Sequence, residues 1–210
     1  WLFYSHRFRV ERIVLENDQV VSVYISGRLL SAYKFKAGQF VVVRFLNRFA
    51  FQAHPFSFSK SYDGQNLRLT IKALGDFTFD LKDKIKVGDY LILEGPYGRF
   101  TLENARTNKI ALVAGGVGVT PIRALLDEAL KQRIDLVGIS CFHNETEAVF
   151  RKEITELLVG SKHPWHYIFS ATDGRLNVDK LKKLVPDYLE RDFYLCGPPA
   201  MSQSVRADLV

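Results

Sequence analysis

Three glycines, at positions 115, 116 and 118, separate a short apolar run from a segment with helical spacing. The run Lys109–Ala114 predicts a buried strand. Pro121 stands where the helix would begin. Proline suits a first helical position, because the N–H that it lacks would have no partner there. Bare N–H groups and the positive end of the helix dipole would then face a phosphate. The glycines would equally suit an ordinary turn, since Pro121 replaces the third glycine of the pattern G-x-G-x-x-G.

A second glycine lies at the mouth of another expected helix. The segment Ile71–Ala73 ends a predicted strand, Gly75 follows it, and a short helix is predicted over Phe77–Lys84. Backbone N–H groups at this helix start would also suit a phosphate, with the Asp76 carboxylate capping the helix. A simple capped helix explains the same residues.

Aromatic and hydroxyl side chains alternate in the stretch His54–Ser59. The X-Pro step extends the backbone at His54. One side of such a strand offers rings and the other offers hydrogen-bonding groups, which suits a flat heterocycle with a polyol or phosphate tail. An ordinary barrel strand with Phe56 and Phe58 in the core has the same pattern.

Two further stretches combine glycine with proline. Glu94–Gly98 predicts a rigid turn that leaves a strand. Cys196 ends another predicted strand, and the prolines that follow it begin a helix. The Cys196 thiol would therefore lie at the carboxyl end of a parallel strand, where open sheets bind ligands. A buried, inert thiol is the other interpretation.

The composition excludes several classes of protein. With 47% hydrophobic and 25% charged residues, this chain of 210 residues should bury a real core. The longest apolar runs are too short to span a membrane. The two cysteines form no C-x-x-C pair, which argues against a zinc site or an iron–sulfur cluster and fits a reducing, cytosolic compartment. The net charge of +6 could favour phosphorylated cofactors or anionic lipid, but no basic run indicates nucleic acid.

The expected elements fall into two groups. The first has many short strands at even spacing and predicts an antiparallel six-stranded β-barrel or sandwich, with strands Phe8–Leu15, Val20–Ile25, Phe40–Phe45, Phe56–Ser59, Leu67–Ala73 and Tyr90–Leu93. The second alternates strands and helices and predicts an α/β domain with a parallel sheet, with strands Ile110–Ala114, Leu136–Phe142, His166–Ser170 and Phe193–Cys196 and helices 121–132, 146–159, 177–189 and 200–209. The polar segment Glu103–Asn108 separates them. We therefore expect a barrel domain over residues 1–104 and an α/β domain over 105–210.

These residues together resemble the ferredoxin–NADP reductase superfamily over nearly the whole chain. The sequences AGGVGVTPI and CGPPAM, in this order, resemble its nicotinamide-nucleotide signature. Its flavin motif usually reads R-x-Y-S, whereas this chain has His54-Pro55-Phe56-Ser57. That variant looks like the dehydrogenase domain of prokaryotic NADPH oxidases and ferric reductases. In that branch the domain is fused to a haem-carrying membrane domain.

The resemblance implies that the barrel binds FAD. His54 and Ser57 would contact the ribityl-pyrophosphate side, and Pro55 and Phe56 would lie beside the isoalloxazine. Along the rest of the cofactor the resemblance places Lys72, Ala73, Gly75, Asp76, Phe77 and Thr78. Because His54 replaces an arginine, a permanent cation near the phosphates is lost, and FAD would bind loosely and exchange.

The resemblance also implies that the α/β domain binds NADPH. The pyrophosphate and ribose would contact Gly115, Gly116, Gly118, Val119 and Thr120. The nicotinamide pocket would be lined by Cys196, Gly197 and Pro198, with Cys196 as the candidate catalytic residue. The strand Leu136–Phe142 is not followed by an Asp or Glu that would hold a ribose 2′-hydroxyl. Ser170, Thr172 and Arg175 would instead hold a 2′-phosphate; a solvated turn is the other role for Arg175.

The implied activity is hydride transfer from NADPH to FAD, for which the two rings must approach to roughly 3–3.5 Å. Single electrons would then pass to a haem in a transmembrane domain of the same full-length protein, and on to oxygen, giving superoxide, or to ferric iron. The chain would thus be a piece of a multi-pass membrane protein, at the cytoplasmic face of the cell membrane. One alternative is a soluble reductase for ferredoxin, flavodoxin or an oxygenase. Another is a nucleotide-binding regulator without turnover.

Overall fold

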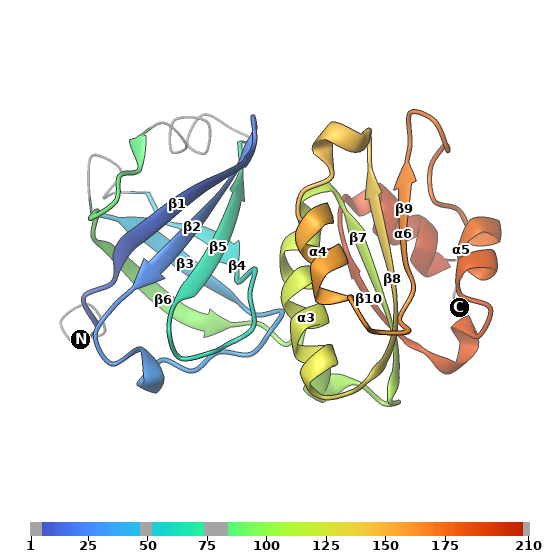
Figure 1. Cartoon of the computed structure of the whole chain (residues 1–210), viewed down its shortest axis with the longest axis horizontal. Coiled ribbons are helices and arrows are strands. Elements are labelled where there is room, and N and C mark those ends of the chain that lie inside the picture. The colour runs from blue at the N-terminus through green and yellow to red at the C-terminus, as the bar shows by residue number, and fades with distance from the viewer. Residues whose placement is uncertain (1–5, 47–51, 74–83, 208–210) are drawn as a thin grey trace. The chain divides into compact units, whose positions relative to one another are not determined.

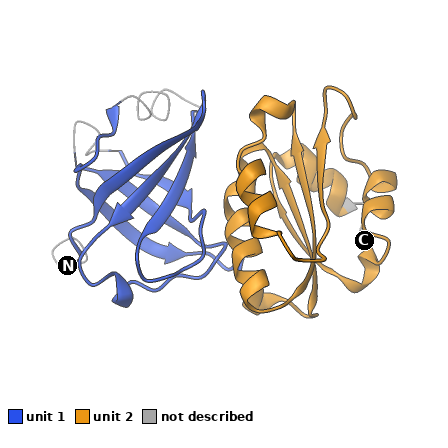
Figure 2. Cartoon of the chain, viewed as in Figure 1, with its two compact units in different colours: residues 1–101 blue, residues 102–210 orange. Residues whose placement is uncertain are grey.

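The structure is a computed structural model that describes residues 6–46, 52–73 and 84–207. The chain divides into two compact units, residues 1–101 and residues 102–210 (Figure 2). Each unit contains a hydrophobic core of its own, so each can be described by itself.

The described part of the first unit contains two three-stranded antiparallel sheets, with strand orders β1-β2-β5 and β4-β3-β6 (Figure 1). The strands are β1 (Arg9–Asn17), β2 (Val20–Ser26), β3 (Phe40–Phe45), β4 (His54–Ser57), β5 (Leu67–Lys72) and β6 (Leu91–Tyr97), with a 3₁₀ turn η1 at Leu30–Ala32. The sheets join at both sides. Phe58 bridges to Leu69 of β5, and Arg9 of β1 bridges to Tyr90. The sheets therefore close into the predicted six-stranded antiparallel barrel.

Alternating residues fill the barrel. On β2, Val21, Val23 and Ile25 belong to one hydrophobic cluster, because side chains two residues apart point to the same face of a strand. Phe58 is fully buried and its ring stacks on that of Phe35, with centroids 3.9 Å apart. This part of the aromatic pattern belongs to the core.

Two barrel predictions need correction. Strand β4 begins two residues before the predicted Phe56, and the predicted turn Glu94–Gly98 lies mostly inside β6. The register between β3 and β6 shifts there, so the strand accommodates Gly95, with φ of 136°, and Pro96 as an irregularity instead of ending. The predicted helix Phe77–Lys84 falls almost entirely outside the described residues.

The second unit contains a parallel sheet of four strands in the order β10-β7-β8-β9. Figure 1 shows α3 and α4 on one face of this sheet and α5 and α6 on the other. The elements are β7 (Lys109–Gly115), α3 (Val119–Lys131), β8 (Asp135–Phe142), α4 (Arg151–Leu157), β9 (Trp165–Phe169), α5 (Val178–Leu184), β10 (Asp192–Cys196) and α6 (Pro199–Ala207), with 3₁₀ turns η2 (Leu102–Asn104), η3 (Gly116–Gly118), η4 (Glu145–Glu147) and η5 (Tyr188–Glu190). This is the predicted α/β architecture.

The strand order creates a switch point beside β7. The chain proceeds outward from β7 to β8 and β9, then returns to place β10 on the other side of β7. The helices that follow β7 and β10, α3 and α6, cover opposite faces of the sheet. In open α/β sheets the carboxyl ends of such a strand pair form the ligand crevice, and we call this place the crevice.

Two helix predictions were too long. The predicted helix 146–159 is divided into η4 and α4, because Phe150 between them has a left-handed backbone with φ of 64°. The predicted helix 177–189 ends at Leu184. Pro186 follows, and the residue before a proline is held away from the helical conformation.

An arginine joins three strands at the amino end of this sheet. Arg191 Nη1 donates to the carbonyl oxygens of Ile110 (3.2 Å) and Asp135 (3.3 Å), and Nε donates to Asp187 Oδ1 at 2.7 Å. The hydrogen bond from Arg191 holds the pKa of the Asp187 carboxyl below its usual range. Arg191 thereby fixes β10 against β7 and β8 at the end opposite the crevice.

We expect Arg191→Gln to lower the free energy of unfolding by about 2 kcal/mol, because buried charge-assisted hydrogen bonds are lost. The Asp187 contribution is present above about pH 4 and is lost as the pH falls through its lowered folded pKa. The difference between the two proteins should therefore shrink in acid. Urea unfolding at several pH values measures it, with Lys152→Gln, on the exposed side of α4, as the control. An equal stability of Arg191→Gln and the parent at neutral pH would contradict this role.

Candidate functional site

At the carboxyl ends of β7 and β10, the backbone of Gly118 lies against the backbone of Cys196 and Gly197. A Cβ atom built on Gly118 would lie 2.1 Å from the carbonyl oxygen of Cys196 and 2.8 Å from the nitrogen of Gly197. Only glycine permits this approach. The turn after β7 is thus in contact with the turn after β10. Each turn was identified in the sequence from its own residues, and the contact between them is seen only in the structure.

Two further glycines shape the same place. A Cβ atom on Gly115 would lie 2.7 Å from Met201 Sδ and 2.8 Å from Pro198 Cδ, and one on Gly197 would lie 2.5 Å from Met201 Cε. Gly116 differs, because a Cβ atom there would meet nothing within 4 Å, while its φ of 54° favours glycine. The backbone is therefore tightly packed around Gly115, Gly118 and Gly197, while the space beside Gly116 is open.

Helix α3 begins at this opening. Its N-cap residue, Gly118, provides no side-chain cap, and its first turn contains no acidic residue. The Thr120 hydroxyl donates to the carbonyl oxygen of Val117 at 2.7 Å. Pro121 is the third residue of α3 and not the predicted first, because η3 continues directly into the helix. Because the Val119 N–H already donates to the carbonyl oxygens of Gly116 and Val117, the N–H groups that suit an anion at this end are those of η3, together with the helix dipole.

The two thiols of the unit lie near the crevice. Cys196 is in register with Ala114 of β7, and Cys141 of β8 is in register with Gly115. Burial raises the pKa of the Cys196 thiol, and burial raises that of Cys141 to about 11. Both are protonated at neutral pH and hence weak nucleophiles. This environment suits Cys196 as a wall of a pocket.

The predicted 2′-phosphate residues lie in the turn after β9. Ser170 Oγ is 3.4 Å from His143 Nδ1, and the Arg175 side chain is exposed. Lys180, which the sequence analysis did not consider, lies beside the same turn, and its Nζ donates to the carbonyl oxygens of Asp173 and of Arg175, the latter at 3.1 Å. The Asn177 side chain accepts from the Lys180 N–H and caps α5. The turn therefore has two cations beside it.

The predicted flavin residues that the structure describes lie on two neighbouring barrel strands. His54 begins β4 in register with Val43, while Lys72 ends β5 and is followed by Ala73. The antiparallel bridge from Phe58 to β5 places His54 and Lys72 at the same end of the barrel. Pro55 is exposed, and His54, Phe56 and Ser57 are half-buried. Gly75, Asp76, Phe77 and Thr78 lie outside the described residues.

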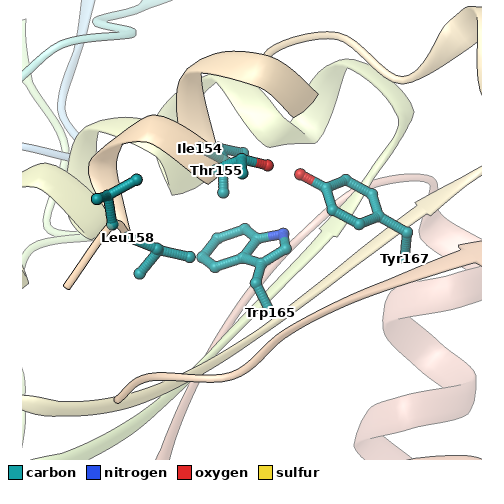
Figure 3. Close-up of a pocket in the computed structure, with 6 residues that line it drawn as sticks. Ile154, Thr155, Leu158, Trp165 and Tyr167 are labelled. Atoms are coloured by element: carbon teal, nitrogen blue, oxygen red, sulfur yellow. The ribbon is translucent and has the colours of Figure 1, made fainter. Parts of the chain in front are cut away.

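A separate cavity of about 350 Å³ lies between α4 and the edge strand β9 (Figure 3). Trp165 and Tyr167 form its floor, with Ile154 and Thr155 of α4 above them, and the Tyr167 hydroxyl points toward Thr155. Trp165 Nε1 donates to Ser140 Oγ at 3.1 Å. No predicted site residue lines this cavity, and two strands separate β9 from β10. The crevice beside β7 is thus the better candidate for the predicted chemistry.

Among the described residues, no group of three His, Cys, Asp or Glu side chains could hold a metal ion. Within the same ranges, every helix falls short of the length and apolarity that crossing a bilayer would require.

Comparison with known families accounts for both units. Residues 5–101 match the model of an FAD-binding domain, and residues 112–207 match that of an oxidoreductase NAD-binding domain. The chain belongs to the ferredoxin–NADP reductase superfamily. Its two units are accordingly the FAD-binding and NAD-binding domains of this superfamily.

Relatives of this reductase-type chain include larger proteins. It is 31% identical to a flavohemoprotein of Pseudomonas putida over 98% of its own length and 55% of the relative's. It is 26% identical to a glycine betaine monooxygenase reductase subunit of Chromohalobacter salexigens over 98% of its length and 60% of that protein's. The chain thus spans little more than half the length of these relatives.

Solved structures share the fold of the ferredoxin–NADP reductase superfamily seen here. The FAD/NAD-binding domain of a Vibrio cholerae nitric oxide dioxygenase superimposes with a TM-score of 0.82 at 24% identity, covering 96% of this chain and 91% of that one. A Neisseria gonorrhoeae ferredoxin NADP⁺ reductase with bound FAD and NADP gives 0.79 at 18% identity, covering 97% and 90%. At these identities the likeness concerns the fold.

We expect Gly118→Ala to weaken NADP⁺ binding at least about tenfold, because its Cβ would push the two turns apart and displace the α3 N-terminus. Calorimetric titration of NADP⁺ measures the change. Gly160→Asn is the matched control, because Gly160 has open space around it and a φ that asparagine tolerates. Unchanged affinity in a folded Gly118→Ala protein would separate this contact from the nucleotide site.

Proposed function

We propose that this chain is the reductase module of an electron-transfer system, which takes electrons from NADPH and delivers them singly to a protein or domain partner. The observation that carries the proposal is the glycine turn η3, which leads into α3 at the β7/β10 switch point and is held in place by the contact of Gly118 with the Cys196 backbone. The FAD-binding and NAD-binding domain matches support it.

The relatives indicate the kind of partner. Flavohemoproteins and oxygenase reductase subunits favour a reductase that serves a haem domain or an oxygenase over the membrane NADPH oxidase expected from the resemblance. The oxidase alternative, with oxygen or ferric iron as final acceptor, draws on the His54–Ser57 variant of the flavin motif.

In the NAD-binding unit, the α3 N-terminus and the backbone of Gly116 would receive the nucleotide pyrophosphate. The wall formed by Cys196, Gly197 and Pro198 would bound the nicotinamide. The turn from Ser170 to Arg175 would hold the adenosine end, where Arg175 and Lys180 supply positive charge for a 2′-phosphate.

In the barrel unit, the half-buried strand His54–Ser57 and the end of β5 at Lys72 would hold FAD. A bound flavin supplies the one chemical ability that side chains lack, because it accepts two electrons together and releases them singly. The residues of β4 bind and orient it. Phe58, directly after β4, anchors the strand in the barrel core.

The decisive experiment is anaerobic mixing of the FAD-loaded protein with NADPH. We expect the oxidised-flavin absorbance to disappear, and single-electron acceptors then to be reduced catalytically. Binding of both nucleotides without bleaching would instead support the regulator without turnover. A second measurement in air distinguishes the oxidase from a reductase that serves a protein partner. Superoxide formation at the rate of NADPH oxidation would favour the oxidase.

Nucleotide preference tests the turn after β9. We expect Arg175→Ala to raise the KM for NADPH about tenfold or more and that for NADH less than about twofold, since one charge-assisted contact to phosphate is lost. Steady-state reduction of ferricyanide measures both values. Arg133→Ala, which removes an exposed cation from the turn after α3, is the control. Equal increases for both nucleotides would remove Arg175 from the site.

A further inference from the structure

The sheet β1-β2-β5 buries polar side chains on the face that points away from the barrel core. Val23 of β2 and Leu69 of β5 belong to the core, so the residues on either side of them point to the opposite face of the sheet. Three of those residues are nonetheless at most 4% exposed: Ser22, Arg68 and Thr70. Buried polar groups of this kind need hydrogen-bond partners.

One cross-strand row connects β1 with the segment after β4. Arg12 is in register with Tyr24, and Tyr24 is in register with Arg68. The Ser59 N–H then donates to the Arg68 carbonyl oxygen at 2.9 Å. Arg12 Cζ lies 3.7 Å from the centroid of the Tyr24 ring, and Arg68 Cζ lies 5.8 Å from it. Strand β5 therefore links β2 to the end of β4 (Figure 1).

The Arg68 side chain holds Ser59 at two points. Arg68 Nη2 donates to the Ser59 carbonyl oxygen at 2.5 Å, and Nε donates to Ser59 Oγ at 3.0 Å. Nη1 donates to the Tyr24 hydroxyl at 3.4 Å. These three acceptors are neutral oxygens. Because the guanidinium is planar and rigid, its two bonds to Ser59 fix both the backbone and the side chain of that residue.

A chain of hydroxyl groups completes the network. Thr70 Oγ1 donates to Ser59 Oγ at 2.8 Å, and the Ser59 hydroxyl donates to the Arg68 carbonyl oxygen at 3.2 Å. Ser22 Oγ lies 2.8 Å from Thr70 Oγ1. Since the Thr70 hydroxyl has a single proton, which it gives to Ser59, Ser22 is the donor in this bond. The network therefore attaches Ser59 to β5, and β5 to β2.

The same ladder includes the strand expected to bind the flavin. Phe58 bridges to Leu69 in antiparallel pairing, so Ser57, the last residue of β4, lies opposite Thr70. Ser59, which Arg68 holds, is thus the second residue after β4. A displacement of Ser59 would shift the end of β4 with it.

The direction of β4 relates Arg68 to one end of the cofactor. The expected placement of FAD has His54 on the pyrophosphate side and Phe56 beside the isoalloxazine. From Phe56 the chain continues toward Ser59 and Arg68, away from His54. The Arg68 guanidinium therefore lies toward the isoalloxazine end and not toward the phosphates.

Fold stability alone does not account for a cation at this position. Burying a guanidinium carries a desolvation cost that an apolar side chain of similar length, such as methionine, does not have. A flavin that takes up two electrons and one proton becomes negatively charged, and a buried cation close to it stabilises that charge. The charge of Arg68 is thus suited to a ligand whose own charge changes.

We propose that Arg68 is a positioning residue for FAD, which fixes the end of β4 through Ser59 and favours the reduced flavin through its charge. The inference rests on the proposed function, because it requires FAD to bind along β4. Arg68 acts on the cofactor through Ser59 and through its electric field, without touching the cofactor itself.

The test compares Arg68→Met, Arg68→Lys and the control Arg12→Met. Arg12 is exposed and lies at the β1 end of the same row, so the control removes one charge from the same face of the sheet. Calorimetric titration measures FAD affinity. Anaerobic titration with dithionite beside a reference dye measures the two-electron potential of the bound flavin, and thermal unfolding of the FAD-free proteins monitors the fold.

Each variant has its own expected result. Arg68→Met should weaken FAD binding at least about tenfold and lower the equilibrium constant for flavin reduction about tenfold, a potential about 30 mV more negative. Arg68→Lys keeps the charge but loses the planar fork, so it should weaken binding while the equilibrium constant stays within about twofold of the parent's. Arg12→Met should change neither quantity by more than about twofold.

Three results would overturn the proposal. An unchanged potential in Arg68→Met would leave Arg68 a structural residue of the barrel, and equal shifts in Arg68→Met and Arg12→Met would assign the effect to overall charge. A parent chain that binds no FAD would also exclude it. If Arg68→Met does not fold, Arg68→Lys decides: weaker binding at unchanged potential supports the proposal, and unchanged affinity overturns it. Because dithionite supplies the electrons, these results hold even if NADPH fails to reduce the flavin and the proposed function is wrong.

Discussion

The contact between Gly118 and the backbone after β10 is the constraint on which the nucleotide site depends. It joins two turns that lie far apart in sequence, and it leaves no room for a side chain. With the turns joined, η3 and α3 start at the carboxyl end of the sheet, where the N–H groups of η3 suit an anion. The Arg191 hydrogen bonds fix the same strands at their other end, so the register that aligns Cys196 with Ala114 is held at both ends.

In the barrel unit, the corresponding residues belong to one continuous segment, His54–Phe58. In the strand His54–Ser57, Pro55 is exposed, and directly after the strand Phe58 enters the core and bridges to β5. The barrel-core interpretation of the aromatic pattern is confirmed for Phe58, whereas flavin contact by His54–Ser57 stays a prediction.

Much of this fold could be predicted from local patterns, because alternation on β2 and β5 and the apolar runs of β7 and β8 depend only on neighbouring residues. The errors arise where a local rule was overridden or overlooked. Gly95 and Pro96 suggested a turn, but pairing with β3 keeps them in the sheet as an irregularity. Pro186 was a stop signal inside a predicted helix. For the site, the glycine and cysteine motifs could be found in sequence, but their contact depends on β10 returning beside β7, and strand order is not a local property.

The most direct test of the central claim is a backbone NMR titration of the FAD-loaded chain with NADP⁺. The account predicts the largest amide shifts at Gly116, Val119 and Thr120 and at Cys196 and Gly197, with little change beside Arg191 at the opposite end of the sheet. The largest shifts at the amino ends of β7 and β10, or in the cavity beside Trp165, would contradict it.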